Sequence, residues 1–531
     1  MKRWTIVGWL LLLAFAAALG FADRKALAQN PLTPPEARGK QIYNRGTSTS
    51  GKEIFAYIGD SSLEVPGATM ACANCHASRG QGKPEGGIDP SNITWEALTK
   101  PYGVTHTSGR KHPAYTERGL ELAITRGLDP AGNKLLAVMP RYSMTKEDLA
   151  DLVVYLKRLG TDTDPGVEDN RIVIGTAVPA KGPLGDMGQA VKDVLLAAFA
   201  EINAGGGIYN RRLELKFVET GENAAATRAN IDRLIKDEKV FAMLGVFLAG
   251  AEKEVTPLFA EQEVPLVGPL TLDPKIGSPL NRQVFYLTSG NAAQARALIG
   301  FLAKQPEAKA RALAVVYPPT DLNRSILEAV KSEAERDGLP APTVREYTTG
   351  TFDAVAIVKQ FSEQGIGAVL FLGSTADLTA FMTEADKANW FPHILLQSGG
   401  FDRGVFNAPA GFEGKLLFTL PTSPSDQKVD ALTEYRLLTE KYKLQPKHQA
   451  AQISAYAAAK LLIEALKRAG KDLTRERLIQ VLEGFYEYQT GLTPPITWGP
   501  SRRIGAMGAY VVRVDIKGKQ FVPASGWIAI N

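Results

Sequence analysis

The chain has 531 residues, of which 45% are hydrophobic and 22% are charged. One hydrophobic core rarely organises so long a chain, so the composition predicts two or more globular domains and excludes a mainly disordered protein. The formal net charge is +5, and Lys2, Arg3, Arg24 and Lys25 against Asp23 supply +3 of it. The rest of the sequence contains no basic run, so we do not expect nucleic-acid binding.

The first 28 residues have the form of an export signal. Lys2 and Arg3 precede an apolar run from Trp4 to Ala22, and Ala26-Leu27-Ala28 has the small-x-small form of a signal peptidase site. We therefore expect residues 1–28 to be removed and the mature protein to work in the periplasm. The apolar run is also long enough to span a bilayer, so an uncleaved segment would instead be an N-terminal membrane anchor.

The two cysteines of the chain lie in the motif Cys72-Ala73-Asn74-Cys75-His76. Two thiols at this spacing can each bond one vinyl group of a haem, and the following histidine is then held against the iron. The motif predicts one covalent haem c on Cys72 and Cys75, with His76 as an axial ligand. The alternatives are a thioredoxin-like redox pair, which gains nothing from the histidine, and a zinc site, which lacks a second pair of ligands.

A methionine in the same region is the candidate for the second axial ligand. Met139 precedes Pro140 and an expected closing helix, for which Thr145 and Asp148 form a capping box and in which apolar residues continue at helical spacing to Leu159. The pattern resembles the class I cytochrome c family, in which a Met-Pro loop leads into the last helix and the methionine sulfur binds iron. The resemblance implies this role for Met139. Met144 is the alternative, and His106 and His112 are further candidates.

The resemblance covers residues 36–160 and implies a small all-α cytochrome c domain over residues 29–160. Pro34 and Pro35 can begin an N-terminal helix that, in such cytochromes, crosses the last one. About 26 residues separate Gly46 from Cys72, where small cytochromes have only a few. We expect this insert, and the segment 109–113, to cover a haem edge or to form a partner surface.

A second domain follows a polar segment rich in Pro and Gly. We interpret residues 161–170 as a linker. From Arg171 onward, short apolar runs alternate with amphipathic helical stretches, which predicts βαβ units and parallel sheets covered on both faces. The strands are expected at 172–178, 213–218, 240–246 and 264–267, and then, in a second series, at 283–287, 313–317, 368–372 and 394–397. Two such series predict a two-lobed α/β domain over residues 171–531.

This half of the chain resembles the Leu/Ile/Val-binding type of periplasmic solute receptor, which has the type I periplasmic binding protein fold. The matching stretches are Ile174–Pro179 with Gly182–Gly185 and Gly188, Glu201–Gly207, Val264–Val267, and a closing segment from Gly508 to Ile530. The Glu-Ile-Asn-Ala-Gly-Gly stretch is the most specific of them.

Ligands of open parallel sheets sit at the loops beyond the carboxyl ends of the strands. This rule predicts the following ligand-binding residues: Leu248, Ala249, Gly250, Leu270, Thr271, Asp321, Ser374, Ser398 and Phe401. The sequence departs from amino-acid receptors, because Phe247-Leu248-Ala249-Gly250 replaces a serine-bearing loop and Pro318-Pro319 replaces a Tyr-Gly pair. A less polar organic solute is therefore at least as well supported as an amino acid.

We do not expect an enzyme. The sequence lacks a Walker A motif, a Gly-x-Ser-x-Gly elbow and a His-Glu-x-x-His site. The leading hypothesis is an exported electron carrier with a fused solute-binding domain, whose redox partner is a dehydrogenase or a terminal cytochrome. The alternative is the receptor of an ABC permease with an accessory haem domain. A third hypothesis, catalysis at the haem, needs an open iron position, which Met139 would close.

Overall fold

The structure is a computed structural model that describes residues 32–530, apart from 60–62, 83–86, 107, 278, 306–311 and 398–402. The expected export signal therefore lies outside the described residues. The chain divides into two compact units: residues up to Val167 together with Lys471–Arg477, and Glu168–Gly470 together with Leu478–Asn531. Within the described part of the chain, no helix combines the length and the apolar character needed to cross a bilayer.

The N-terminal unit is built from short helices around one core. Its helices are α2 (Pro34–Arg45), α3 (Cys72–His76), α4 (Trp95–Leu98), α5 (Glu117–Arg126) and α6 (Lys146–Leu156). Both predicted terminal helices are present: Pro34 opens α2, and the Thr145 hydroxyl caps α6 by accepting the Asp148 N–H at 3.0 Å. The two helices cross so closely that a Cβ on Gly39 would lie 2.1 Å from the Asp151 carbonyl oxygen.

The unit also contains strands that the all-α expectation lacked. β1 (Phe55–Ile58) pairs antiparallel with β2 (Leu63–Pro66) and with β5 (Arg141–Ser143), and β3 (Val104–Thr105) pairs with β4 (Lys111–His112). The insert before Cys72 thus supplies β1, the partner of the strand that directly follows Met139 and Pro140. Phe55 lies opposite Ser143 in this register.

The polar segment after Leu159, which we interpreted as a linker, is held in place over part of its length. Lys40 Nζ lies 2.8 Å from a carboxylate oxygen of Asp162 and 2.8 Å from one of Asp164. The Asp164 carboxylate also accepts the backbone N–H of Arg475 at 2.5 Å. The composition of the segment predicted a linker without tertiary contacts. The two carboxylates instead bind Lys40 on α2, which precedes Asp164 by 124 residues.

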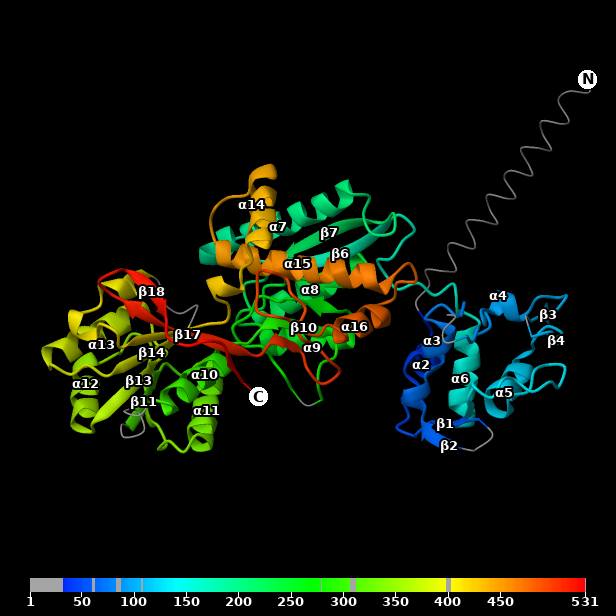
Figure 1. Cartoon of the computed structure of the whole chain (residues 1–531), viewed down its shortest axis with the longest axis horizontal. Helices are drawn as coiled ribbons and strands as arrows, with labels where there is room; N and C mark the ends of the chain where they lie inside the picture. The colour runs from blue at the N-terminus through cyan, green and yellow to red at the C-terminus, as the bar shows by residue number, and fades with distance from the viewer. Residues whose placement is uncertain are drawn as a thin grey trace, which may run out of the picture. The chain divides into compact units, whose positions relative to one another are not determined.

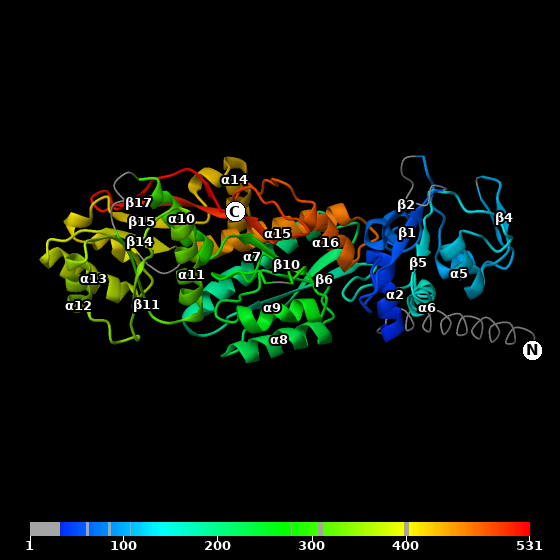
Figure 2. The same ribbon diagram turned by 90° about the horizontal axis from the view of Figure 1, so that it is seen from below.

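The second unit has two α/β lobes, as predicted (Figure 1). The first lobe has a parallel sheet in the order β16-β10-β9-β8-β6-β7. Its strands are β6 (Arg171–Val178), β7 (Arg212–Glu219), β8 (Ala242–Leu244), β9 (Leu266–Val267), β10 (Val284–Thr288) and β16 (Ile504–Ala506). Figure 2 shows α8 and α9 on one side of this sheet and α7 and α15 on the other. The helices are α7 (Gly185–Ala204), α8 (Ala224–Asp237), α9 (Glu252–Glu261), α14 (Val429–Lys441), α15 (Gln449–Ala469) and α16 (Arg475–Glu483).

The second lobe has a sheet in the order β12-β11-β13-β14-β15-β17-β18, in which β17 runs antiparallel to β15. Its strands are β11 (Ala312–Tyr317), β12 (Thr343–Glu346), β13 (Ile366–Phe371), β14 (His393–Gln397), β15 (Leu416–Leu420), β17 (Gly508–Asp515), β18 (Gln520–Pro523) and β19 (Ile528–Ala529). Its helices are α10 (Asn291–Ala303), α11 (Asp321–Arg336), α12 (Ala354–Glu363) and α13 (Thr375–Lys387). Successive residues of β11 alternate between the two faces: Ala314 and Val316 pack with α12 and α13, whereas Leu313 and Val315 pack with α10 and α11.

Candidate functional site

The Cys-x-x-Cys-His motif forms a single helical turn, α3, in the N-terminal unit. His76 is 7% exposed, and its Nδ1 lies 2.9 Å from the carbonyl oxygen of Ser91. Because a carbonyl can only accept, Nδ1 donates, and the Nε2 of a neutral ring keeps its lone pair. Burial lowers the pKa of His76, which favours this neutral form. The histidine is therefore arranged as metal-binding histidines usually are, with one nitrogen oriented by a backbone carbonyl and the other available.

Both cysteines of the motif are free thiols, Cys72 partly buried and Cys75 exposed. Burial raises the pKa of Cys72 to about 12. The reactive cysteine of a thioredoxin-like pair has a lowered pKa, because the thiolate is the nucleophile. The environment of Cys72 thus argues against the redox-pair alternative.

A cavity of about 720 Å³ opens beside α3. Cys72, Cys75, His76 and Met139 all line it, so the structure brings together the four residues predicted to hold a haem. Its other walls are largely hydrocarbon and include Leu98, Leu120, Ile124, Leu135, Leu152 and Leu156. The volume lies within the range of about 300–1,000 Å³ that is usual for cofactor pockets. The cavity therefore fits a large apolar group that carries a metal.

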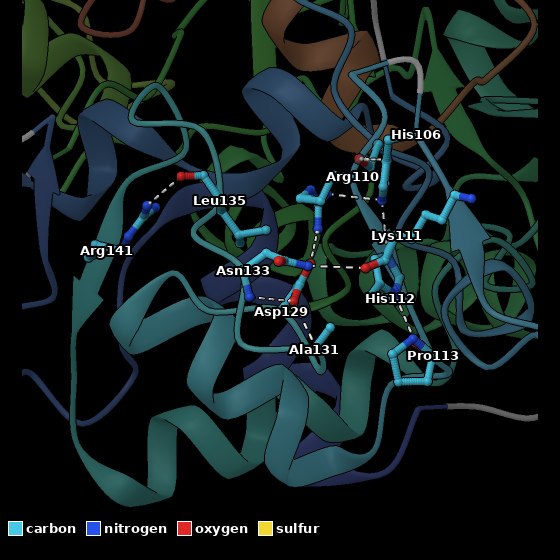
Figure 3. Close-up of polar contacts among 11 residues, drawn as sticks. His106, Arg110, Lys111, His112, Pro113, Asp129, Ala131, Asn133, Leu135 and Arg141 are labelled. Atoms are coloured by element: carbon cyan, nitrogen blue, oxygen red, sulfur yellow. Dashed lines mark hydrogen bonds and ion pairs between the residues drawn. The ribbon is translucent and has the colours of Figure 1, made fainter.

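The two candidate methionines, Met139 and Met144, lie in different parts of the cytochrome unit. Met139 lines the cavity, whereas Met144 packs against the core of the unit. The loop that carries Met139 is held by Arg141, whose guanidinium donates to the carbonyl oxygens of Met139 and of Leu135. Figure 3 shows the contact with Leu135, which is 3.1 Å long. Met70 also lines the cavity and was not considered from the sequence, although it lies only two residues before Cys72.

Polar side chains gather in another part of the cavity wall. His106 and His112, which were further candidates for iron binding, turn towards each other, and their Nε2 atoms lie 2.9 Å apart. Arg110 donates to the Nε2 of His106 at 2.9 Å and to the Asp129 carboxylate at 2.7 Å (Figure 3). Arg110 belongs to the segment 109–113, which we expected to cover a haem edge or to form a partner surface. Asp129 was not considered from the sequence, because only the β3–β4 hairpin and the turn after α5 bring it to Arg110.

In the first lobe of the binding domain, the predicted ligand loops meet at one edge of the sheet. The Leu248 N–H donates to the Leu270 carbonyl at 3.0 Å. Leu248 itself is fully buried in the core of the lobe, whereas Ala249 and Gly250 are exposed. The Thr271 hydroxyl donates to the Glu252 carboxylate at 2.6 Å. Sequence reasoning missed Glu252, which is 7% exposed and whose pKa burial raises.

The predicted loops of the second lobe begin two helices. Asp321 is exposed in the first turn of α11, and Ser374 caps α13, where its hydroxyl accepts the Asp377 N–H at 3.1 Å. The Asn323 side chain joins the two loops, because its amide donates to the Pro318 carbonyl at 2.9 Å and to the Leu372 carbonyl at 3.4 Å. Ser398 and Phe401 lie outside the described residues.

Comparison with protein families matches residues 171–520 to the family described as Periplasmic binding protein. The chain belongs to this family. Residues 36–160 match the family described as Cytochrome c, so the chain also carries a cytochrome c domain, a family that implies covalent haem c. Cytochromes c and periplasmic binding proteins are typically periplasmic and generally not enzymes.

Curated relatives resemble the second unit. The Leu/Ile/Val-binding protein homolog 3 of Brucella melitensis is 23% identical over 299 residues, which are 56% of this chain and 79% of that protein. The leucine-, isoleucine-, valine-, threonine- and alanine-binding protein of Pseudomonas aeruginosa is 21% identical over 301 residues, with the same shares.

Solved structures confirm the type I binding-protein fold with its parallel sheets. A branched-chain amino acid ABC transporter protein from Thermus thermophilus with bound valine aligns with a TM-score of 0.56 and 19% identity, covering 68% of this chain and 98% of that one. A fatty acid ABC transporter substrate-binding protein from Thermomonospora curvata aligns with a TM-score of 0.55 and 17% identity, covering 70% and 95%. At these identities, the likeness shows the fold alone.

Proposed function

We propose that this protein is an exported electron carrier with one covalent haem c, fused to a domain that binds a small organic solute. The observation that carries the first half is the meeting of Cys72, Cys75, His76 and Met139 at one largely apolar cavity. Cys72 and Cys75 would bond the haem, and His76 and Met139 would be its axial ligands. When bound, the haem iron accepts and gives up one electron.

The contacts of the chain support these roles. Ser91 fixes the ring of His76 through Nδ1 and leaves Nε2 for a metal. Arg141 and the pairing of β5 with β1 hold the loop of Met139. The Nε2 atoms of His106 and His112 are engaged with each other, which favours Met139 over either histidine as the second ligand. The largely hydrocarbon walls of the cavity favour the uncharged thioether as a ligand.

A redox titration tests the electron-carrier role. The purified full-length chain should be reduced and reoxidised reversibly by one electron per molecule. It should bind carbon monoxide weakly when reduced, because His76 and Met139 would both bind the iron. Rapid, tight binding of carbon monoxide by the unmodified protein would instead support the third hypothesis, in which the haem acts on a ligand.

The second half of the proposal rests on the binding-protein fold and on the loops that meet at the carboxyl ends of β6, β8 and β9. The loop at Phe247–Gly250 offers few side-chain hydrogen-bond donors, which favours a solute less polar than an amino acid. Calorimetric titration with leucine, valine and a set of short aliphatic acids and alcohols tests this. Binding of the amino acids alone would favour the alternative role, a receptor for an ABC permease with an accessory haem domain.

The names of two solved neighbours support the alternative of an ABC receptor, because both are named as ABC transporter proteins, one for branched-chain amino acids and the other for fatty acids.

A periplasmic dehydrogenase or a terminal cytochrome is the redox partner that the leading proposal requires. Purified partners of these two classes should exchange electrons with this protein in stopped-flow mixing. An ABC permease would not.

A further inference from the structure

The β3–β4 hairpin carries a histidine pair into the haem cavity. Val104 lies opposite His112 in the hairpin, and the backbone N–H of His106 donates to the Arg110 carbonyl at 2.9 Å. These contacts place the rings of His106 and His112 with centroids 5.1 Å apart and their Nε2 atoms 2.9 Å apart. His112 is 7% exposed. The pair is therefore a built feature of the cavity wall.

The hydrogen bonds of the pair determine where its protons lie. The Arg110 guanidinium, which has donors only, lies 2.9 Å from His106 Nε2, so that nitrogen accepts. The Pro113 carbonyl, which only accepts, lies 2.7 Å from His112 Nδ1, so that nitrogen donates. The contact between the two Nε2 atoms then needs a hydrogen on His112 Nε2. The geometry therefore provides a place for one proton more than two neutral imidazoles hold, on the Nε2 of His112.

His106 is the neutral member of the pair. Burial, together with the charges of Arg110 and His112, lowers the pKa of His106. Its Nδ1 then carries the hydrogen and faces the Ser91 hydroxyl at 3.4 Å. An extra proton on His112 Nε2 would thus be shared with His106 across the Nε2 contact.

The groups that contact the pair do not compensate the charge of an extra proton. The Asp129 side chain is fully buried. Burial opposes its ionisation, but hydrogen bonds from Arg110 and Asn133 outweigh this effect and lower the pKa of Asp129, so it neutralises Arg110. Within the described part of the chain, the His112 ring contacts His106, Pro113 and Tyr115, none of which is an anion at neutral pH. The other charged or titratable groups are Lys111 on β4 and, in the cavity wall, Asp89, Lys100, His76, Cys72, Cys75, Tyr43 and Tyr142.

We propose that the His106–His112 pair is a proton site coupled to the redox state of the haem, so that the protein carries a proton together with an electron. This inference rests on the proposed function. Reduction of the bound haem by a donor would add one electron to the cavity, and the pair would then take up the extra proton from solvent, because the added negative charge stabilises the imidazolium in low-dielectric surroundings. Oxidation returns the electron to an acceptor and the proton to solvent.

The midpoint potential of the full-length, haem-loaded protein tests the inference as a function of pH. Between the pKa values of the pair in the oxidised and reduced protein, the potential should fall by up to about 59 mV per pH unit, the one-electron equivalent of a tenfold change in proton concentration. His112→Gln should flatten this region. His448→Gln, an exposed histidine of the binding domain, is the matched control and should keep the wild-type slope.

A proton count on the unmodified protein makes the test independent of variant folding. Stoichiometric reduction in weakly buffered solution should take up a fraction of a proton per electron that approaches one within the sloping region. A flat potential with no uptake between pH 5 and pH 9 overturns the inference, as does a slope that survives in a folded His112→Gln variant. A chain with no covalent haem gives no potential at all, so failure of the proposed function is recognised separately.

Discussion

Gly39 of α2 lies directly on the backbone of Asp151 in α6. A Cβ at residue 39 would lie 2.1 Å from the Asp151 carbonyl oxygen and 2.7 Å from the Cβ of Tyr155. Neither atom belongs to the end of a flexible side chain, so the helices would have to separate. The crossing lies in the core of the cytochrome unit, where Ile42, Tyr43, Leu152 and Leu156 are all buried.

Gly39→Ala should therefore destabilise the cytochrome unit by about 1–3 kcal/mol, the usual cost of overpacking, despite the better helix propensity of alanine. Gly119→Ala in α5 is the matched control, because a Cβ there meets nothing closer than 3.4 Å. We expect the control to be neutral or slightly stabilising. Urea unfolding followed by haem absorbance measures both, and equal stability of the two variants would contradict the close crossing.

Met139→Ala should remove the weak long-wavelength ferric band expected of methionine ligation and lower the reduction potential, because a soft thioether favours ferrous iron. Met144→Leu and Met70→Leu should leave the band in place. Met144 packs against the core. Met70 lines the cavity, so its replacement tests whether a different methionine of the cavity wall binds the iron. Loss of the band in one of these controls, with its retention in Met139→Ala, would move the assignment to that residue.

Lys40→Met should destabilise the cytochrome unit by about 3 kcal/mol, since it removes the cation that the partly buried Asp162 and the buried Asp164 share. Glu117→Gln, which breaks the exposed pair with Lys157, should cost less than about 1 kcal/mol. The free energies of unfolding of the two variants, measured by chemical denaturation near pH 7, give the comparison. Equal effects would mean that the segment after Leu159 is not held by α2.

The ion pair of Asp164 should also make the stability of the cytochrome unit depend on pH in acid. Burial opposes the ionisation of Asp164, but Lys40 and Arg475 outweigh it and lower the pKa of Asp164 in the folded state. Its contribution to stability is therefore present above the unfolded pKa of about 3.9 and is lost as the pH falls through the lower folded value. Asp164→Asn should be less stable than wild type at pH 7 and should approach it in strong acid. A difference that does not change with pH would contradict this linkage.

Glu252 should respond in the opposite direction. Because burial raises its folded pKa, the fold favours the protonated carboxyl, and stability falls as the pH rises from the unfolded pKa through the folded one. Glu252→Gln keeps a polar partner for Thr271 and should remove this fall. The exposed Glu254→Gln on the same helix should not. Thermal midpoints of the binding domain between pH 4 and pH 7 decide between these results.

Much of the fold could be predicted because it depends on local patterns. The buried strand β6 and the capped helix α6 follow from an apolar run and from Thr145 with its helical spacing. β12 was missed because it is short and mostly exposed, and β16 because its pairing with β10 joins segments more than 200 residues apart. No local pattern encodes such a pairing.

The residues of the candidate site likewise fall into those that a local sequence motif predicts and those that only tertiary contacts bring together. Cys72, Cys75 and His76 are readable from the sequence because the chemistry needs them at fixed spacing within one helical turn. The ion pair of Arg110 and Asp129 depends on tertiary contact between a hairpin and a turn. The His106–His112 contact depends on the register of two strands of two residues each.

Cys72 and Cys75 should hold a haem through two thioether bonds, and mass spectrometry of a proteolytic fragment that spans them measures this, on protein exported by a host that attaches haem c. We expect a fragment heavier by one haem, with both thiols unavailable to alkylation, and a Cys72→Ala, Cys75→Ala double variant without that mass. A fragment with two free thiols, or with a disulfide between Cys72 and Cys75, would contradict it.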